Sequence, residues 1–291
     1  MPKYTNNYQL PDYLYQALVA NTYDKVPGTL SATGLTKPYR MAELERVHDD
    51  EIEIECSDLV YAALGTAVHA LVTDHPHPDV QAEKRIIIPL EGLPISITGK
   101  PDIIFQKTRI HDIKCSGAYA MQFAKPDWVA QLNIYAWLVR REYDVEVTEL
   151  VNMLILRDHK KSLTKASATY PPIPIGIINQ PIWPDAKTDA FIRERAAGHL
   201  ACRDAIELPL CTPEERWARE TVYAVVSPGR KRSHKNCSSL AEAKQYIARA
   251  THKAKSQMTV DIRPGEDTRC IDYCPVNRWC PYYLERYGDI E

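Results

Sequence analysis

The sequence predicts an α/β fold in which a mixed β-sheet is flanked by helices. Four short runs rich in β-branched residues follow one another between residues 84 and 114, which favours antiparallel strands. An apolar run at 150–156 follows a helical segment long enough to cross over the sheet, which favours a parallel partner. The 291 residues, 45% of them hydrophobic and 25% charged, are enough to bury such a core.

Each element follows from local pattern. Apolar residues at helical spacing predict a helix at 59–75, capped by Ser57 and Asp58. Strands are expected at 84–90, 94–99, 102–106 and 109–114, as an antiparallel meander with a turn at Lys107–Thr108. Further along we expect a helix at 126–143, a strand at 150–156, a loop at 157–183, a helix at 185–207, a strand at 221–226 and a helix at 239–255.

Charge and composition disfavour a strongly basic nucleic-acid-binding protein, a membrane protein and a secreted protein. The net charge of −2 gives no global basic field, so any nucleic-acid binding must come from local patches. No apolar run approaches the ~18 residues of a membrane span, and the N-terminus has no signal-peptide pattern, so we expect a cytoplasmic protein without a membrane partner. The sequence shows no internal repeat, low-complexity tract or Gly/Ser linker, which predicts a single domain over residues 1–291.

The stretch GKPDIIFQKTRIHDIKCSG places two aspartates on neighbouring predicted strands. Asp102 begins one strand and Asp112 lies near the end of the next, so the turn between them brings the carboxylates together. Mg²⁺ needs only one or two carboxylates plus waters and a substrate phosphate, and the carbonyl of Ile113 is a further candidate ligand. Lys114 shares a strand face with Asp112, where it can bind a phosphate oxygen or position a water. This set predicts metal-assisted phosphodiester hydrolysis, although an Asp-x-Lys triplet alone is common on surface strands.

Two neighbouring helices carry further candidates. His69 lies on the predicted helix before the strands, where it is a possible third metal ligand that suits Mn²⁺, although a lone histidine on an apolar face is more often a core residue. Gln131 and Tyr135 are four residues apart on the later helix and share a face. Alone, these two would indicate only a solvent-facing helix surface.

Together these motifs resemble the PD-(D/E)XK nuclease superfamily, in its RecB-like exonuclease branch. The resemblance covers roughly residues 57–140, and the segment at 30–53 is similar to phage-encoded relatives. It implies a restriction-endonuclease-like core at about 40–160, followed by a helical, cysteine-bearing lobe at about 185–291. It also implies Mg²⁺ or Mn²⁺ and DNA, single-stranded or as duplex ends. The implied metal ligands are His69, Asp102, Asp112 and Ile113, and the implied catalytic residues are Asp102, Asp112, Lys114, Gln131 and Tyr135.

Three of the eight cysteines lie within the last 22 residues, as C-x3-C-x5-C: Cys270, Cys274 and Cys280. Cys-Pro pairs mark loops that suit thiolates around a metal, and a fourth ligand would complete a [4Fe–4S] cluster or a structural zinc site. RecB-like relatives with such a cluster carry one distant cysteine, and their usual spacing is C-x2-C-x5-C. Cys211, in a Pro-flanked loop, is the favoured fourth ligand, with Cys56 second.

A basic turn near the C-terminal third could grip DNA phosphates through Arg230, Lys231, Arg232 and Lys235, although a solvated loop fits equally well. We therefore expect a metal-dependent DNA exonuclease working in recombination, repair or phage DNA processing, with recombination or replication proteins as possible partners. The alternatives are a structure-specific endonuclease, a DNA-binding accessory protein with a vestigial site, and an iron–sulfur redox protein.

Overall fold

The computed structural model describes residues 2–20, 26–123, 125–165, 167–250 and 257–288. The chain divides into two compact units, Met1–Leu208 and Pro209–Glu291. The first holds a mixed α/β arrangement of sheets and helices, and the second holds a small sheet with short helices. The single-domain organisation expected from the sequence stays a prediction.

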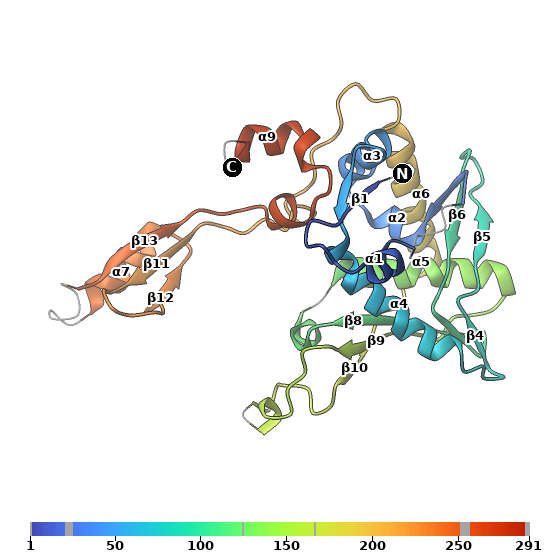
Figure 1. Ribbon diagram of the computed structural model, residues 1–291, viewed down its shortest axis with the longest axis horizontal. Helices are drawn as coiled ribbons and strands as arrows, with labels where there is room; N and C mark the ends of the chain where they lie inside the picture. The colour runs from blue at the N-terminus through green and yellow to red at the C-terminus, as the bar shows by residue number, and fades with distance from the viewer. Residues whose placement is uncertain (1, 21–25, 124, 166, 251–256, 289–291) are drawn as a thin grey trace. The chain divides into compact units, whose positions relative to one another are not determined.

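The first unit contains a five-stranded mixed sheet in the order β10–β9–β8–β7–β4. Figure 1 labels all of these strands except β7. Strands β8 and β9 are parallel, and every other neighbouring pair in this sheet is antiparallel. The turn between β7 and β8 has Gln106 and Lys107 at positive φ, as a tight hairpin requires, one residue earlier than expected. The strands are β4 (Val80–Ala82), β7 (Ile103–Phe105), β8 (Arg109–Ser116), β9 (Glu149–Leu156) and β10 (Ile175–Asn179).

Helix α5 (Pro126–Tyr143) makes the crossover between the two parallel strands. Its bounds match the expected ones because Pro126 suits the first helical turn and Asp144 ends the helix in the left-handed conformation. Most of its residues from Ala130 to Val139 are buried, and they join the main hydrophobic core. The register of this parallel pair places Asn152 opposite Asp112.

The expected meander is split between two sheets. Strands β5 (Ile86–Pro89) and β6 (Ser96–Gly99) pair with each other in a second sheet, whose third strand is β2 (Thr29–Ser31). Residues 100–102 leave the strand conformation at Pro101, so β7 begins a new hairpin. Gly99 lies directly against α5, where an added Cβ would approach Leu138 to 2.5 Å, so the glycine permits this close packing.

Helix α4 (Val60–Thr73) packs against β8 (Figure 1). Ser57 and Asp58 lie in a preceding 3-10 turn, Cys56–Leu59. The expectation that they cap the helix is wrong, because neither side chain makes a capping hydrogen bond. None of the residues of α4 is buried, although its composition is strongly apolar. The remaining elements of this unit are β1 (Lys3–Thr5), α1 (Asp12–Val19), α2 (Ala32–Thr36), α3 (Tyr39–Val47), β3 (Glu53–Glu55) and α6 (Asp185–Ala201).

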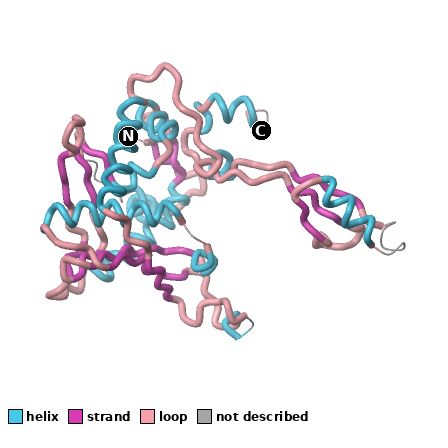
Figure 2. Tube along the Cα trace, turned by 180° about the vertical axis from the view of Figure 1, so that it is seen from behind, coloured by secondary structure: helices cyan, strands magenta, loops and turns pink. Residues whose placement is uncertain are grey.

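The second unit contains an antiparallel sheet in the order β12–β11–β13, with α7 packed on it (Figure 2). Its elements are β11 (Val222–Val226), β12 (Lys235–Cys237), α7 (Leu240–Arg249), β13 (Thr259–Arg263) and α9 (Pro281–Tyr287). The expected helix at 239–255 is described only as far as Ala250, and residues 251–255 lie outside the described residues. Buried Asp267 ties the C-terminal segment together, because it accepts hydrogen bonds from Tyr282 and Tyr287 and pairs with Arg216.

Candidate active site

The candidate site begins where β7 ends and leaves part of β8 without a partner on one side. The β7–β8 register stops at the Ile103–His111 pair. Beyond it, Asp102 Oδ2 accepts a hydrogen bond of 2.6 Å from the Ile113 N–H, so a carboxylate replaces the missing strand partner. The backbone of Ile113 therefore faces the side chain of Asp102 at an open stretch of the sheet edge.

Asp112 is held from both sides by polar groups. It is 1% exposed, and its carboxylate lies 2.9 Å from Lys114 Nζ. On the neighbouring strand, Asn152 Nδ2 donates to Asp112 Oδ2 at 2.8 Å, and Gln180 Nε2 donates to Asn152 Oδ1 at 2.8 Å. These bonds fix the orientation of the carboxylate.

The lysine joins the strand to the helix above it. Lys114 Nζ donates to Gln131 Oε1 at 3.0 Å, and Gln131 Nε2 donates to the Tyr135 hydroxyl at 3.0 Å. The same amide nitrogen lies 3.4 Å from Thr33 Oγ1 of α2. The i, i+4 spacing on α5 thus places Gln131 and Tyr135 in one chain of hydrogen bonds with the ammonium group.

His69 faces the same open edge from α4. Its Nδ1 lies 3.5 Å from Asp102 Oδ1 and 3.5 Å from Glu83 Oε1. Its Nε2 lies 3.4 Å from the carbonyl oxygen of Ile113. Glu83 is also paired with Lys100 at 2.5 Å, and this pairing lowers the pKa of the Glu83 carboxyl.

The electrostatics of the site favour an added positive charge. Burial, and next the charge of Asp112, raise the pKa of Asp102 from 3.8 to about 6. His69, the Ile113 N–H and Lys114 oppose that shift without cancelling it. Two neighbouring carboxylates, one of them buried with a raised pKa, lie beside a backbone carbonyl and form an oxygen-rich donor set suited to Mg²⁺ or Mn²⁺.

The structure brings together all seven residues expected in the site: His69, Asp102, Asp112, Ile113, Lys114, Gln131 and Tyr135. Sequence reasoning missed Thr33, Glu83 and Asn152, because none of them belongs to a recognisable motif. Within the described ranges, no three His, Cys, Asp or Glu side chains are gathered as a metal cage. The donor set still fits Mg²⁺, which keeps several waters and needs few protein ligands.

The four cysteines expected to share a centre all belong to the second unit, and the charges of three of them act on the fourth, Cys270. Burial raises the pKa of the Cys270 thiol to about 12, followed by the charges of Asp267, Cys274, Cys211 and Cys280. None of the eight cysteines is in a disulfide. Cys56 is instead a buried residue of the first unit, beside Asn6 and Glu55.

The cationic side chains of the basic turn at 229–235 differ in whether they already have a partner in the structure. Lys235 Nζ is already paired with Glu242 at 2.7 Å. Arg230 hydrogen-bonds the Arg232 carbonyl and the His234 ring. In the part of the chain that the structure describes, no carboxylate lies within 4 Å of the side-chain nitrogens of Lys231 or Arg232. These two are therefore the cations of the turn most open to a phosphate.

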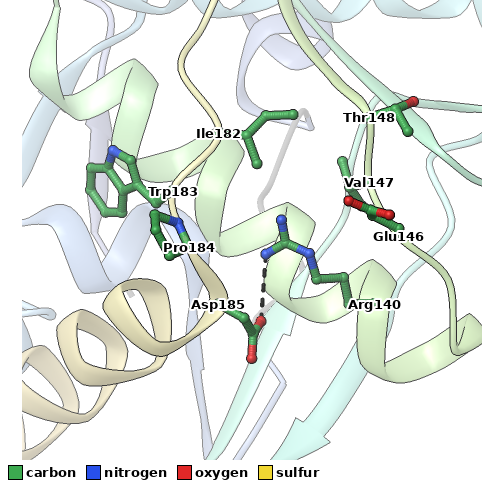
Figure 3. Close-up of a pocket in the computed structure, with 8 residues that line it drawn as sticks. All are labelled: Arg140, Glu146, Val147, Thr148, Ile182, Trp183, Pro184 and Asp185. Carbon is green, nitrogen blue, oxygen red and sulfur yellow. Dashed lines mark hydrogen bonds and ion pairs between the residues drawn. The ribbon is translucent and has the colours of Figure 1, made fainter.

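A pocket lies elsewhere in the first unit, between the C-terminal part of α5 and the segment before α6 (Figure 3). Arg140 points toward Asp185 there, at 3.4 Å, and Trp183 lines one wall. Arg140 and Asp185 pair with each other, and none of the residues that line this pocket is one of the candidate active-site residues.

The fold and this arrangement of two aspartates and a lysine define a nuclease class. A family model described as the PD-(D/E)XK nuclease superfamily matches residues 74–281, and the chain belongs to that superfamily. The matched residues include both aspartates, Lys114, Gln131, Tyr135 and the four cysteines of the second unit, whereas His69 precedes them. The mixed sheet flanked by helices agrees with the restriction-endonuclease-like fold expected from the sequence.

Solved structures are similar to parts of the chain. The protein SSO0001 is 19% identical with a TM-score of 0.44, covering 64% of this chain and 84% of its own. LHK-Exo, an alkaline exonuclease from Laribacter hongkongensis, is 16% identical with a TM-score of 0.35, covering 64% and 90%. A protein assigned as an exonuclease from Eubacterium rectale is 12% identical with a TM-score of 0.38, covering 71% and 97%. A search of curated protein sequences found no match.

One helical segment of the described chain, Cys56–Thr73, is long and apolar enough by composition to cross a membrane. No such segment is expected from the sequence, because small residues such as Ala62 and Gly65 interrupt the run of large apolar residues. The segment includes α4, which packs against β8 and carries His69 to the carboxylates. These contacts make it part of the nuclease fold.

Proposed function

We propose that the protein is a metal-dependent deoxyribonuclease, and specifically an exonuclease, as its resemblance to RecB-like exonucleases implies. The observation that carries the proposal is the convergence of Asp102, Asp112 and Lys114 at the open edge of β8. A vestigial site would have no reason to keep Lys114 aligned by both Asp112 and Gln131. A structure-specific endonuclease would use the same residues, and the assay below distinguishes the two.

Asp102, Asp112, the Ile113 carbonyl and His69 would hold a Mg²⁺ or Mn²⁺ ion. When bound, the ion supplies a Lewis acid for the phosphate and lowers the pKa of a water. Lys114 holds a water or a phosphate oxygen beside Asp112, with its ammonium group fixed at 2.9 Å and 3.0 Å from two acceptors. Gln131 and Tyr135 position that ammonium group, and Tyr135 is itself buried against the core.

The second unit would bind a [4Fe–4S] cluster through Cys211, Cys270, Cys274 and Cys280, with structural zinc as the alternative. Besides burial, the charges of the other three thiols raise the pKa of Cys270, which supports a shared centre because a bound cation would stabilise neighbouring thiolates. Such a centre would join Cys211 to a C-terminal segment some 60 residues away and so restrict the unfolded chain. Its role is structural.

DNA is the proposed partner, with Lys231 and Arg232 of the basic turn contacting its phosphates, and Arg230 and Lys235 contributing less because they are already engaged. If the enzyme works in recombination, repair or phage DNA processing, recombination or replication proteins are further partners. A cytoplasmic location suits a chain whose most apolar helix supports the active site.

The function is tested by incubating the pure protein with end-labelled linear DNA and closed circular DNA, in Mg²⁺, Mn²⁺ or EDTA. An exonuclease degrades the linear DNA, spares the circle and stops in EDTA, whereas a structure-specific endonuclease also cuts a closed circle that carries an unpaired bubble. Asp112→Asn should lower cleavage at least about 10³-fold, because the metal contribution is worth several kcal/mol. Asp185→Asn, which removes a paired surface aspartate, is the matched control. Wild-type cleavage by Asp112→Asn would refute the assignment.

A further inference from the structure

An aromatic side chain and a cation lie together at the start of α4. The guanidinium carbon of Arg157 lies 4.3 Å from the ring centroid of Tyr61. The tyrosine is nevertheless 63% exposed, so a large part of its ring remains open to solvent. An arginine stacked on an exposed aromatic ring is chemically suited to a nucleobase and its phosphate.

This pair lies close to the candidate active site. The backbone N–H of Arg157 donates to the Ser116 carbonyl at 3.0 Å, and Ser116 is two residues beyond Lys114 on β8. Two residues of strand span about 7 Å. Tyr61 precedes His69 by eight residues on α4, which corresponds to about 12 Å along the helix axis. Because Arg157 is bonded to the last residue of β8 and contacts Tyr61, the pair lies near the C-terminal end of that strand.

The segment that begins with Arg157 is rich in positive charge. Residues 157–165 contain four cations, and Asp158 is their only acidic residue. The Asp158 carboxylate accepts a hydrogen bond of 2.7 Å from the Ala118 N–H, so it is oriented toward the backbone there. Among the described residues, no carboxylate lies within 4 Å of the side-chain nitrogens of these cations, which are Arg157, Lys160, Lys161 and Lys165.

We propose that Tyr61 and Arg157 bind an unpaired nucleotide of the DNA strand next to the scissile phosphate, with its base stacked on Tyr61 and its phosphate contacting Arg157. The inference rests on the proposed nuclease function and specifies its substrate as a single strand or an end with unpaired nucleotides. Bases inside a duplex are already stacked and cannot cover the ring of Tyr61. The cations at 160–165 then extend the phosphate-binding surface along the same strand.

The test measures binding in EDTA, where no cleavage interferes. Wild-type protein is titrated with a labelled oligothymidylate of about 12 nucleotides and with a blunt duplex of the same length. Tyr61→Ala should weaken single-strand binding on the order of tenfold and duplex binding much less, whereas Tyr61→Phe should keep the wild-type Kd. Arg157→Ala should reduce the slope of log affinity against log salt by about 0.7. Lys187→Ala removes a second exposed cation, 4.5 Å over Trp183, and is the matched control.

The outcomes separate this inference from the nuclease function itself. Equal single-strand affinities of wild type, Tyr61→Ala and Tyr61→Phe would overturn it, as would an equal loss for Ala and Phe. An Arg157→Ala slope no different from that of Lys187→Ala would overturn the phosphate contact. Metal-dependent cleavage together with single-strand binding that does not depend on Tyr61 would support the nuclease function and overturn the inference about Tyr61. Tyr61-dependent binding without any cleavage supports the inference and removes the proposed function.

Discussion

Replacing Asn152 by leucine tests how the active-site carboxylate is oriented. The change is nearly isosteric, and it removes the hydrogen bond to Asp112 and the bond from Gln180, both 2.8 Å long. Asn152 is fully buried, so each partner left unsatisfied costs about 1–3 kcal/mol. Lys114 still contacts Asp112, so we expect a total loss of about 3 kcal/mol in the free energy of unfolding. In a unit of this size that corresponds to a Tm lower by about 6–12 °C.

The informative measurement is metal affinity. Partners that orient a metal-binding carboxylate typically contribute 10–100-fold, so the Kd for Mn²⁺ measured by calorimetry should rise about that much in Asn152→Leu. Asn133→Leu is the matched control, because Asn133 is equally buried and makes hydrogen bonds to Val129, Pro181 and Trp183 on α5 and the loop beyond it. It should also lower the Tm, but it should leave the Mn²⁺ affinity unchanged.

Two results would refute this reasoning. If Asn152→Leu melts early yet binds Mn²⁺ with the wild-type Kd, then Asn152 stabilises the sheet without orienting Asp112 for a metal. If Asn133→Leu loses the same affinity, the loss reflects general destabilisation and not the orientation of Asp112.

Three further predictions concern other regions. Burial lowers the pKa of His199 from 6.5 to about 4, so the contribution of this residue to the free energy of unfolding, about 2–3 kcal/mol, is present above pH 6.5 and is lost as the pH falls toward 4. Urea unfolding at pH 6.5 and pH 4 should show this loss in wild type and not in His199→Gln, and equal losses in the two proteins would contradict the prediction. Anaerobically purified protein should contain about four irons per chain, and Cys274→Ser should lose the iron and have a lower Tm, whereas Cys202→Ser should keep the wild-type iron content and Tm. Finding zinc would preserve the structural role, and finding neither metal would exclude the centre. Replacing Lys231 and Arg232 by glutamine should reduce the slope of log DNA affinity against log salt by about 0.7 per cation, whereas Lys235→Gln should change the slope little because Lys235 is paired with Glu242. Identical slopes for all variants would show that the turn is a solvated loop.

The parts of the fold that depend on local chemistry were predictable from the sequence. Helix α5 begins and ends where Pro126 and Asp144 indicate, and β8 lies where its alternation suggests. Strand β10 was missed inside the expected 157–183 loop, because prolines precede it and, as an edge strand, it leaves Ile175 and Ile177 exposed. The meander was wrong because hydrophobic alternation gives strands but not their pairing partners.

The site was predictable to the extent that its residues form motifs in the chain. His69, the two aspartates and Lys114 were identified from spacing and resemblance, and the structure brings them together. Asn152 meets Asp112 only through the register of two parallel strands that are 40 residues apart. Glu83 reaches His69 because its backbone is bonded to the Asp102 carbonyl after β4. Neither relation leaves a pattern in the sequence.

The hydrogen bond from the Ile113 N–H to Asp102 gives this aspartate a reason to be retained that is independent of catalysis. Its carboxylate ends the sheet where β7 stops, so selection for foldability alone would preserve an acid or a similar acceptor at that position. A lineage that lost nuclease activity could therefore keep Asp102 while Asp112 or Lys114 drifted. When homologous sequences are compared, activity is better inferred from Asp112 and Lys114 together than from the Pro-Asp pair that first attracts notice.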